Sequence, residues 1–167
     1  MAETFPLKLV TPTGVVFDGP VVEVTAEGAL GQFAVLAKHI NYITSLVPGV
    51  LRINLADGGV ENWVVSGGLA EVKDGVMTVL AYGAERPASI DAQAAAADEK
   101  AAADRIATLS AYEDEYSAAA EALLLARARI TAVALESIAR HVRCGSVAVL
   151  DDAVRDRCGG ALREIES

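Results

Sequence analysis

Few side chains in this sequence have a type and spacing that could carry out a reaction. His39 could act as a general base only beside a partner acid or nucleophile, and its neighbours supply neither. We therefore expect His39 to be a loop or interface histidine. Asp151 and Asp152 form a carboxylate pair, but adjacent residues do not share one face of a helix. A solvated helix start accounts for this pair better than acid–base chemistry does.

A glycine-rich run could hold a phosphate group. Ser66, Gly67 and Gly68 form such a run, but it lies between two expected strands rather than before a helix, so a turn explains it better. The sequence contains no Gly-x-x-x-x-Gly-Lys phosphate loop, no nucleophile elbow, no His-Glu-x-x-His motif and no Gly-x-Gly-x-x-Gly fingerprint. We expect a protein that is not an enzyme in its own right.

The two cysteines, Cys144 and Cys158, are the remaining reactive side chains. They lie fourteen residues apart, neither belongs to a Cys-x-x-Cys pair, and His141 alone does not complete a set of metal ligands. Free thiols in a reducing compartment are the simpler interpretation. We expect no metal site and no cofactor.

Composition excludes several other classes of function. The 167 residues carry a formal charge of −9 and no cluster of Lys and Arg, so nucleic acid is not an expected partner. Although 53% of the residues are hydrophobic, no uninterrupted apolar run approaches the roughly 18–20 residues that span a bilayer. The first residues lack the basic and apolar regions of a secretory signal and the arginines of a transit peptide. We expect a soluble, cytosolic chain.

A change in composition near residue 87 predicts two kinds of structure. All five prolines lie at or before Pro87, as do eleven of the fourteen glycines, and no glycine occurs between Ala84 and Cys144. Proline and glycine punctuate turns between short strands, whereas an Ala-rich stretch without glycine favours helix. We therefore divide the chain into residues 1–86, residues 87–142 and a C-terminal extension over residues 143–167.

Before this change, apolar and polar residues alternate, as in residues 51–55, which read Leu-Arg-Ile-Asn-Leu. Turn signals recur every few residues, and they include Thr13-Gly14, Asp18-Gly19, Glu27-Gly28, Pro48-Gly49, Asp57-Gly58, Gly67-Gly68 and Asp74-Gly75. Many short strands at this spacing predict an antiparallel β-sandwich or barrel. The Asp57-Gly58 and Asp74-Gly75 pairs are favourable hairpin turns because they adopt positive φ at low cost.

After the change, the spacing becomes helical. The first helix is expected to open at residues 89–91 and to reach about Leu109. Its predicted apolar side carries Ile90, Ala94, Ala97 and Ala101, extended by Ile106 and Leu109. Residues 110–113, Ser-Ala-Tyr-Glu, match a capping box, so a second helix is expected to begin near Tyr112. Its predicted apolar stripe runs through Tyr116, Ala119, Leu123, Ala126, Ile130 and Val133.

Two helices with a short connection pack as an antiparallel hairpin. Such a hairpin has little core of its own, so it should lean on the sandwich or on a partner protein. The helical pattern continues through Val142, stops at residues 144–145 and resumes from Val147 to Arg157. The C-terminal extension is therefore a short extra helix or a partly ordered tail, and its role stays open.

Five segments, in order and at matching spacing, resemble the epsilon subunits of F-type ATP synthases, called delta in mitochondria. They are residues 7–19, 31–39, 48–53, 65–72 and the stretch 79–91 with Val79-Leu-Ala81, Ala84-Glu-Arg86 and Ile90-Asp91. The resemblance covers roughly residues 5–135. It implies an α+β, two-domain chain: an antiparallel β-sandwich of about ten strands, then an α-helical hairpin.

The resemblance also implies a function. The family's sandwich binds the rotating gamma subunit and sits on the ring of membrane-embedded c subunits, coupling proton-driven rotation to ATP synthesis. Its hairpin can extend toward the catalytic alpha and beta subunits and regulate ATP hydrolysis. Contact with the membrane would be indirect, through the c ring. The expected location is the cytoplasmic face of a bacterial inner membrane, in preference to the matrix side of a mitochondrion.

Site residues follow from the same resemblance. Gln32 and His39 are expected on loops that face the c ring, and residues 66–68 (Ser66, Gly67 and Gly68) near gamma. Some family members bind ATP at a motif whose first positions match Ile90 and Asp91.

That ATP motif is degenerate in this chain. The next expected arginine is Ala94 here, Leu125 replaces another, and Arg129 is retained. A polyphosphate needs charge-assisted donors, so we expect weak ATP binding or none. The second helix begins with acidic residues, which also weakens the case for inhibition of hydrolysis.

A different class of protein fits the same patterns. The chain could be a free-standing β module that binds a small molecule and dimerises through its hairpin, with the second helix's stripe as the seam. A stable one-to-one complex with a gamma subunit would favour the rotor interpretation, and self-association alone would favour the β module.

Overall fold

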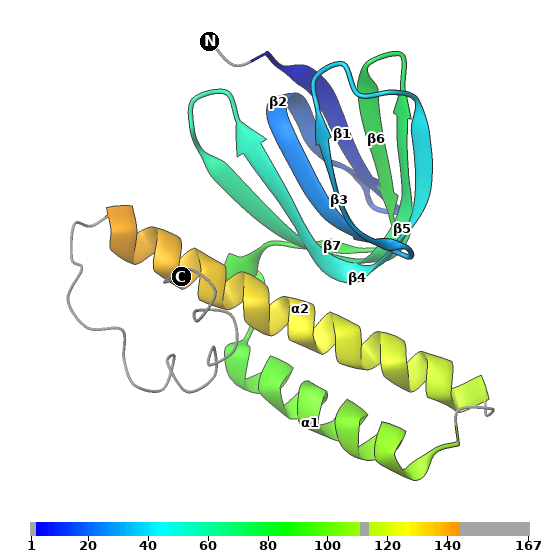
Figure 1. The fold of residues 1–167 in the computed structure, drawn as a ribbon. Coiled ribbons are helices and arrows are strands. Elements are labelled where there is room, and N and C mark those ends of the chain that lie inside the picture. The colour runs from blue at the N-terminus through cyan, green and yellow to red at the C-terminus, as the bar shows by residue number, and fades with distance from the viewer. Residues whose placement is uncertain (1–2, 111–113, 144–167) are drawn as a thin grey trace, which may run out of the picture.

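The protein forms a β-sandwich with two helices beneath it, in a computed structural model that describes residues 3–110 and 114–143 (Figure 1). Seven strands come first, followed by a short 3₁₀ turn and two α-helices. Their bounds are β1 (Phe5–Thr11), β2 (Gly14–Gly28), β3 (Gly31–Leu36), β4 (Tyr42–Leu55), β5 (Val60–Lys73), β6 (Val76–Ala81), β7 (Ala84–Glu85), η1 (Pro87–Ser89), α1 (Ala92–Thr108) and α2 (Asp114–Arg143).

The strands close on themselves. The order in the sheet is β1-β6-β5-β4-β2-β3, and β1 also pairs with β2, so five strands form a ring with β3 and β7 attached. The β1–β6 pair is parallel and the other pairs are antiparallel. Closure leaves few free edges, which protects a small sheet from pairing with other chains.

The ring encloses a core of alternating side chains. In β1, Phe5, Leu7 and Leu9 are buried while Pro6 and Lys8 face solvent. The other fully enclosed members of the core include Val21, Val24, Val35, Leu51, Ile53, Met77 and Val79. The period-two pattern thus predicts the sandwich because one face of each strand is buried.

The described residues form seven strands, so the expectation of about ten was wrong. Residues 18–19, 48–49 and 67–68, taken as turns, lie inside β2, β4 and β5, which are 15, 14 and 14 residues long. At the last of these, Gly67 and Gly68 have φ of 105° and 141°, and pairing with β4 continues on both sides. A glycine or proline in these strands bends the strand without ending it, because the neighbouring ladder holds both halves.

The two predicted hairpin turns are confirmed. Asp74 and Gly75 both have positive φ, 51° and 80°, between the paired ends of β5 and β6. Asp57 accepts a hydrogen bond from the backbone N–H of Gly59 at 2.9 Å, and Gly58 has φ of 84°. Local turn chemistry decides these two connections.

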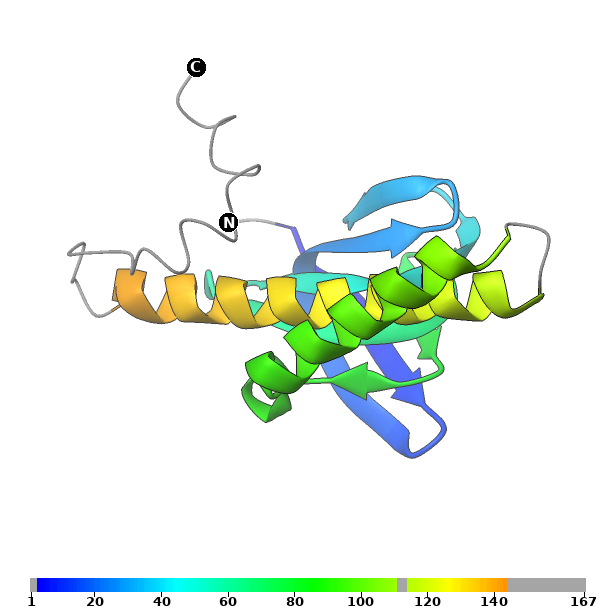
Figure 2. The same cartoon turned by 90° about the horizontal axis from the view of Figure 1, so that it is seen from below.

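The helices follow the predicted bounds closely. Helix α1 ends at Thr108, one residue before the predicted end, and α2 reaches Arg143. Glu113 of the predicted capping box lies outside the described residues. Viewed from below, α1 crosses α2, and α2 lies between α1 and the sheet (Figures 1 and 2). Within the described part of the chain, neither helix combines the length and apolarity needed to cross a membrane.

The predicted apolar side of α1 was wrong at its three alanines, whereas Ile90, Ile106 and Leu109 are half-buried. Ala95 and Ala102 are the buried residues of α1, whereas Ala94, Ala97 and Ala101 are exposed. In an Ala-rich helix all faces are similarly apolar, so spacing alone cannot select the buried face. The predicted stripe of α2 agrees with the structure at Ala119 and Ala126, which are both buried.

Candidate functional site

A junction between the sandwich and the helices is built around Arg129 of α2. Its Nε donates to Oε2 of Glu85 at 3.1 Å, and its Nη2 donates to Oε1 of the same carboxylate at 2.6 Å. Its Nη1 lies 3.6 Å from Oδ2 of Asp98. One guanidinium therefore joins α2 to β7 of the sandwich and to α1, in the two-pronged geometry that arginine forms best with carboxylates.

Hydrogen bonding to Glu85 is the main reason that the pKa of Arg129 is raised, against an opposing effect of burial. Because the folded-state pKa is higher than the unfolded one, the resulting stability is complete below the ordinary arginine pKa. It is lost only as the pH rises above that value. The arginine side of this junction is therefore insensitive to changes of pH around neutrality.

An apolar contact lies beside the junction. Val64 of β5 is buried with Ala128 and Ala132 of α2, and Val50, Ile90 and Leu125 pack around them. Small alanines let the helix backbone approach the sheet closely. The hairpin thus leans on the sandwich through a narrow contact, supplemented by the Arg129–Glu85 pair.

Three residues expected to belong to a degenerate ATP motif have structural contacts here. Ile90 packs in the apolar contact just described. Asp91 is the N-cap of α1, and its Oδ1 accepts from the backbone N–H groups of Gln93 and Ala94 at 2.8 and 3.2 Å. Arg129 is engaged by two carboxylates. Asp91 and Arg129 thus have local partners that a polyphosphate would have to displace.

Residues 66–68 form a bend in the middle of β5. The N–H of Ser66 donates to the carbonyl oxygen of Gly83 at 3.1 Å, and that of Tyr82 donates to Gly67 at 3.1 Å. The ring of Tyr82 lies against Gly67, within 3.5 Å of where a Cβ would be. Tyr82 as a whole is 76% exposed. At the bend, an exposed tyrosine therefore lies beside the backbone of a glycine, which has no side chain to cover it.

An apolar strip crosses the outer face of the sheet next to this bend. The apolar strip consists of four residues that lie in register on β2, β1, β6 and β5, namely Val15, Val10, Leu80 and Leu69. Val15 is 55% and Leu80 48% exposed. Cross-strand neighbours of this kind make one continuous surface.

Gln32 and His39 lie at opposite ends of β3. Gln32 is in the strand rather than in a loop, and its Nε2 donates to Oε1 of Glu27 at 3.0 Å. His39 lies in the turn after the strand, where its Nδ1 is 2.8 Å from the carbonyl oxygen of Ile40 and its ring contacts Tyr42 edge-on. Ile40 is 77% exposed beside it. The two residues therefore do not form one local site.

Sequence reasoning missed Tyr82 and the partner of Arg129. Tyr82 could have been found, because it continues the outward-facing alternation of Val76, Thr78 and Leu80 in β6. Glu85 lies 44 residues from Arg129, and no local pattern signals such a pair. No cluster of three or more His, Cys, Asp or Glu side chains suited to a metal occurs within residues 3–110 and 114–143.

The fold and the junction define a small sandwich-and-hairpin protein with exposed apolar surface. A family model described as the β-sandwich domain of the ATP synthase delta/epsilon chain matches residues 4–87. The ATP synthase epsilon chain of Thioalkalivibrio sulfidiphilus is 34% identical over 86% of this chain and 100% of its own length. That of Nitratiruptor is 42% identical over 49% of this chain and 64% of its own. The chain belongs to the ATP synthase delta/epsilon family.

A solved structure has the same fold. A chain of the Euglena gracilis mitochondrial ATP synthase, solved with OSCP, F1 and the c ring, superposes with a TM-score of 0.68 at 24% identity. The superposition covers 78% of this chain and 81% of that one.

Proposed function

We propose that this chain is a non-catalytic central-stalk subunit of an F-type ATP synthase. In this role the sandwich binds the gamma subunit and rests on the c ring, so that proton-driven rotation is coupled to ATP synthesis. The chain would sit on the cytoplasmic face of a bacterial membrane and touch that membrane only through the c ring. Family membership and the exposed apolar surface of the sandwich support the proposal.

The apolar strip and Tyr82 carry the assignment of the gamma-binding surface. They border residues 66–68 and combine partly exposed aliphatic side chains with an exposed tyrosine. Tyrosine is enriched among the residues that dominate the energetics of protein interfaces, and the buried centre of an interface is more apolar than the surrounding surface. The turn with His39 and Ile40 is the proposed contact with the c ring. It lies at the end of β3 opposite to Gln32, so we do not place Gln32 in that contact.

The Leu80→Asp change should weaken binding of the gamma subunit at least about tenfold, which corresponds to about 1.4 kcal/mol. A carboxylate in the middle of the strip would have to lose its water on binding. The measurement is calorimetric titration of gamma into the full-length chain. Val60→Asp is the matched control, since Val60 is 40% exposed but begins β5 at the β4–β5 turn, outside the strip. Equal weakening by both changes, or none by Leu80→Asp, would place gamma elsewhere.

The hairpin is the regulatory element in this proposal. Its contact with the sandwich is small, so a partner with modest preference for the released hairpin can shift the balance toward it. A released hairpin reaches toward the alpha and beta subunits and there affects ATP hydrolysis.

ATP should not saturate the protein in calorimetry at millimolar concentrations. The carboxylates of Glu85 and Asp98 already contact Arg129, and a polyphosphate brought beside them would be repelled. The Glu85→Gln variant separates repulsion from the shortage of arginines: because only Arg129 of the family's arginines is retained, ATP binding should stay weak even when that negative charge is removed. Tight ATP binding by the unaltered chain would contradict the prediction.

A further inference from the structure

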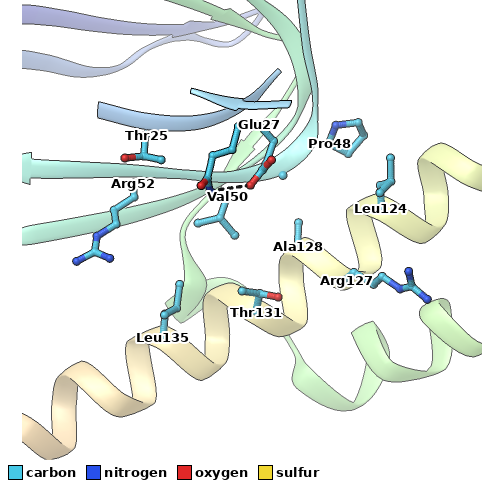
Figure 3. Close-up of a pocket in the computed structure, with 12 residues that line it drawn as sticks. Thr25, Glu27, Pro48, Val50, Arg52, Leu124, Arg127, Ala128, Thr131 and Leu135 are labelled. Atoms are coloured by element: carbon cyan, nitrogen blue, oxygen red, sulfur yellow. Dashed lines mark hydrogen bonds between the residues drawn. The ribbon is translucent and has the colours of Figure 1, made fainter. Parts of the chain in front are cut away.

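A groove lies between helix α2 and the outer face of β2 and β4. It has a volume of about 420 Å³, which is within the range of sites that hold small molecules. Figure 3 shows the sheet on one side of the groove and α2 on the other. Because the two walls belong to the sandwich and to the hairpin, the groove exists only while the hairpin is docked on the sandwich.

One part of the groove is apolar. Val50 of β4 and Ala128 of α2 form its floor. Pro48 and Leu124 lie at one end, and Leu124 is 41% exposed (Figure 3). From Leu124 to Thr131 is seven residues, or about 10 Å along the helix. An alkyl chain of medium length fits along this part of the groove.

Arg52 supplies a positive charge at the other end. Its side chain extends from β4 toward α2, over the end of the groove that Leu135 occupies (Figure 3). Arg52 is exposed, and no ion pair joins it to another residue in the part of the chain that the structure describes. Arg127 also lines the groove, but it pairs with Glu99 of α1 at 3.1 Å. The Arg52 end is therefore suited to an anionic group.

Glu27 brings a carboxylate into the same wall, but its partner is Gln32 and not Arg52. The Nε2 atom of Gln32 donates to Oε1 of Glu27 at 3.0 Å. The stem of Glu27 lies against the backbone of Gly49, where a Cβ would be 2.7 Å from Cγ of Glu27. The absence of a side chain at Gly49 thus lets Glu27 lie along the sheet, and the charge of Arg52 stays available to a ligand.

We propose that this groove binds a small amphipathic carboxylate. The apolar body of the ligand lies on Val50, Ala128 and Leu124, and its carboxylate meets Arg52. Such a ligand contacts the sandwich and α2 together, so it binds the docked hairpin and not the released one. By linkage, it stabilises the docked form. The site requires only the docked fold, so it stands independently of the proposed role in an ATP synthase.

Calorimetric titration of the full-length chain with decanoate, below the concentration at which decanoate forms micelles, tests the site. Decanoate should bind at least about tenfold more tightly than decyltrimethylammonium, which has the same chain and the opposite charge. Because the protein carries a formal charge of −9, non-specific attraction would favour the cation instead. Acetate, which lacks the apolar body, should bind at least about tenfold more weakly than decanoate. Absence of decanoate binding, or equal binding of the cation, would overturn the proposal.

The Arg52→Gln variant tests the anionic end. It should weaken decanoate binding at least about tenfold, because a charge-assisted contact is lost. Lys73→Gln is the matched control, since it removes the same charge from an exposed side chain at the end of β5, outside the groove. That control should change the affinity less than about twofold. Equal weakening by both changes would show that decanoate responds only to overall charge, which would overturn the proposal.

The apolar end has its own pair of variants. Leu124→Asn should weaken decanoate binding at least about fivefold, because it removes apolar surface that the alkyl chain covers. Ile138→Asn is the control, since Ile138 is on the same helix and is 39% exposed but does not line the groove. It should change the affinity less than about twofold. Equal weakening by both variants would contradict the placement of the ligand.

Hydrogen exchange gives a readout of docking. Saturating decanoate should slow amide exchange in residues 124–135 at least about threefold, because the ligand holds α2 on the sandwich. The Arg52→Gln variant at the same decanoate concentration should show a smaller effect. Unchanged exchange in the unaltered chain with bound decanoate would show that decanoate binds elsewhere.

Discussion

Replacing Arg129 with glutamine should release the hairpin from the sandwich. The change removes both hydrogen bonds to Glu85 and the contact with Asp98, while leaving a shorter, uncharged polar side chain. The Arg129 side chain is only 26% exposed, so the loss should exceed that of a surface pair and reach about 1–2 kcal/mol. That loss shifts the docked-to-released ratio about 5- to 30-fold. Hydrogen exchange of the α2 amides facing Val64 measures the shift.

Arg127→Gln is the matched control for this experiment. Arg127 lies two residues earlier on α2, is 59% exposed and pairs with Glu99 of α1, not with the sandwich. Its replacement should change exchange by no more than a few-fold, since exposed pairs contribute at most about 1 kcal/mol. Glu85→Gln should reproduce Arg129→Gln, and the double variant should add little, because the two groups form one interaction. If the hairpin stays on the sandwich in both Arg129→Gln and Glu85→Gln, the apolar contact alone is sufficient to hold it there.

Replacing Gly68 with alanine should strongly destabilise the sandwich. A Cβ at this position would collide with the backbone oxygen of Leu80 and lie 2.9 Å from Cα of Ala81. The residue also has φ of 141°, which side chains rarely adopt. Backbone atoms in a paired strand cannot move aside cheaply, so the free energy of unfolding should fall by about 2–4 kcal/mol. Urea unfolding followed by the fluorescence of Trp63 measures it.

Gly58→Ala separates the two causes. Gly58 also has positive φ, 84°, but no atom lies within 4 Å of the Cβ that would be added. Only the backbone strain remains, so this change should lower the free energy of unfolding by about 1–2 kcal/mol. If Gly58→Ala costs as much as Gly68→Ala, the close approach of β5 to β6 is not what requires a glycine at position 68.

The gamma-binding proposal gains a further check from Gly68. A strand that no longer bends at residues 67–68 would move Tyr82. The ring of Tyr82 lies against Gly67, and the backbone N–H of Tyr82 donates to the carbonyl oxygen of Gly67. Any Gly68→Ala protein that stays folded should therefore bind gamma more weakly. The Leu80→Asp variant, in contrast, should weaken gamma binding while leaving the bend intact, because Leu80 points outward.

Local interactions made much of the fold predictable. Alternation in β1 and β4 marks the buried faces because a strand packed on one side must place apolar residues at every second position. The Asp74-Gly75 turn and the Asp91 cap are decided within three or four residues, by positive φ in one case and by a carboxylate beside free N–H groups in the other. The change of composition at Pro87 likewise follows from the different demands of turns and helices.

The errors arose where a neighbour in space overrides local preference. Gly67 and Gly68 were expected to end a strand, yet pairing to β4 on both sides of them carries β5 through. In α1 the choice of Ala95 and Ala102 as the buried positions depends on where α2 lies, since one alanine looks like the next. In both cases the sequence offers several local solutions of similar free energy, and packing selects one.

The sequence by itself determined that this chain has a pleated half and a helical half, where its tight turns fall and which family it resembles. Only the tertiary structure decided that Arg129 meets Glu85 across 44 residues, that Tyr82 lies beside a bent strand, and that Leu124 and Ile138 of α2 remain exposed to solvent. The physical reason is the distance along the chain between the residues that interact. Turns, caps and strand alternation are settled by neighbours along the chain, whereas ion pairs and surfaces depend on how completed elements pack.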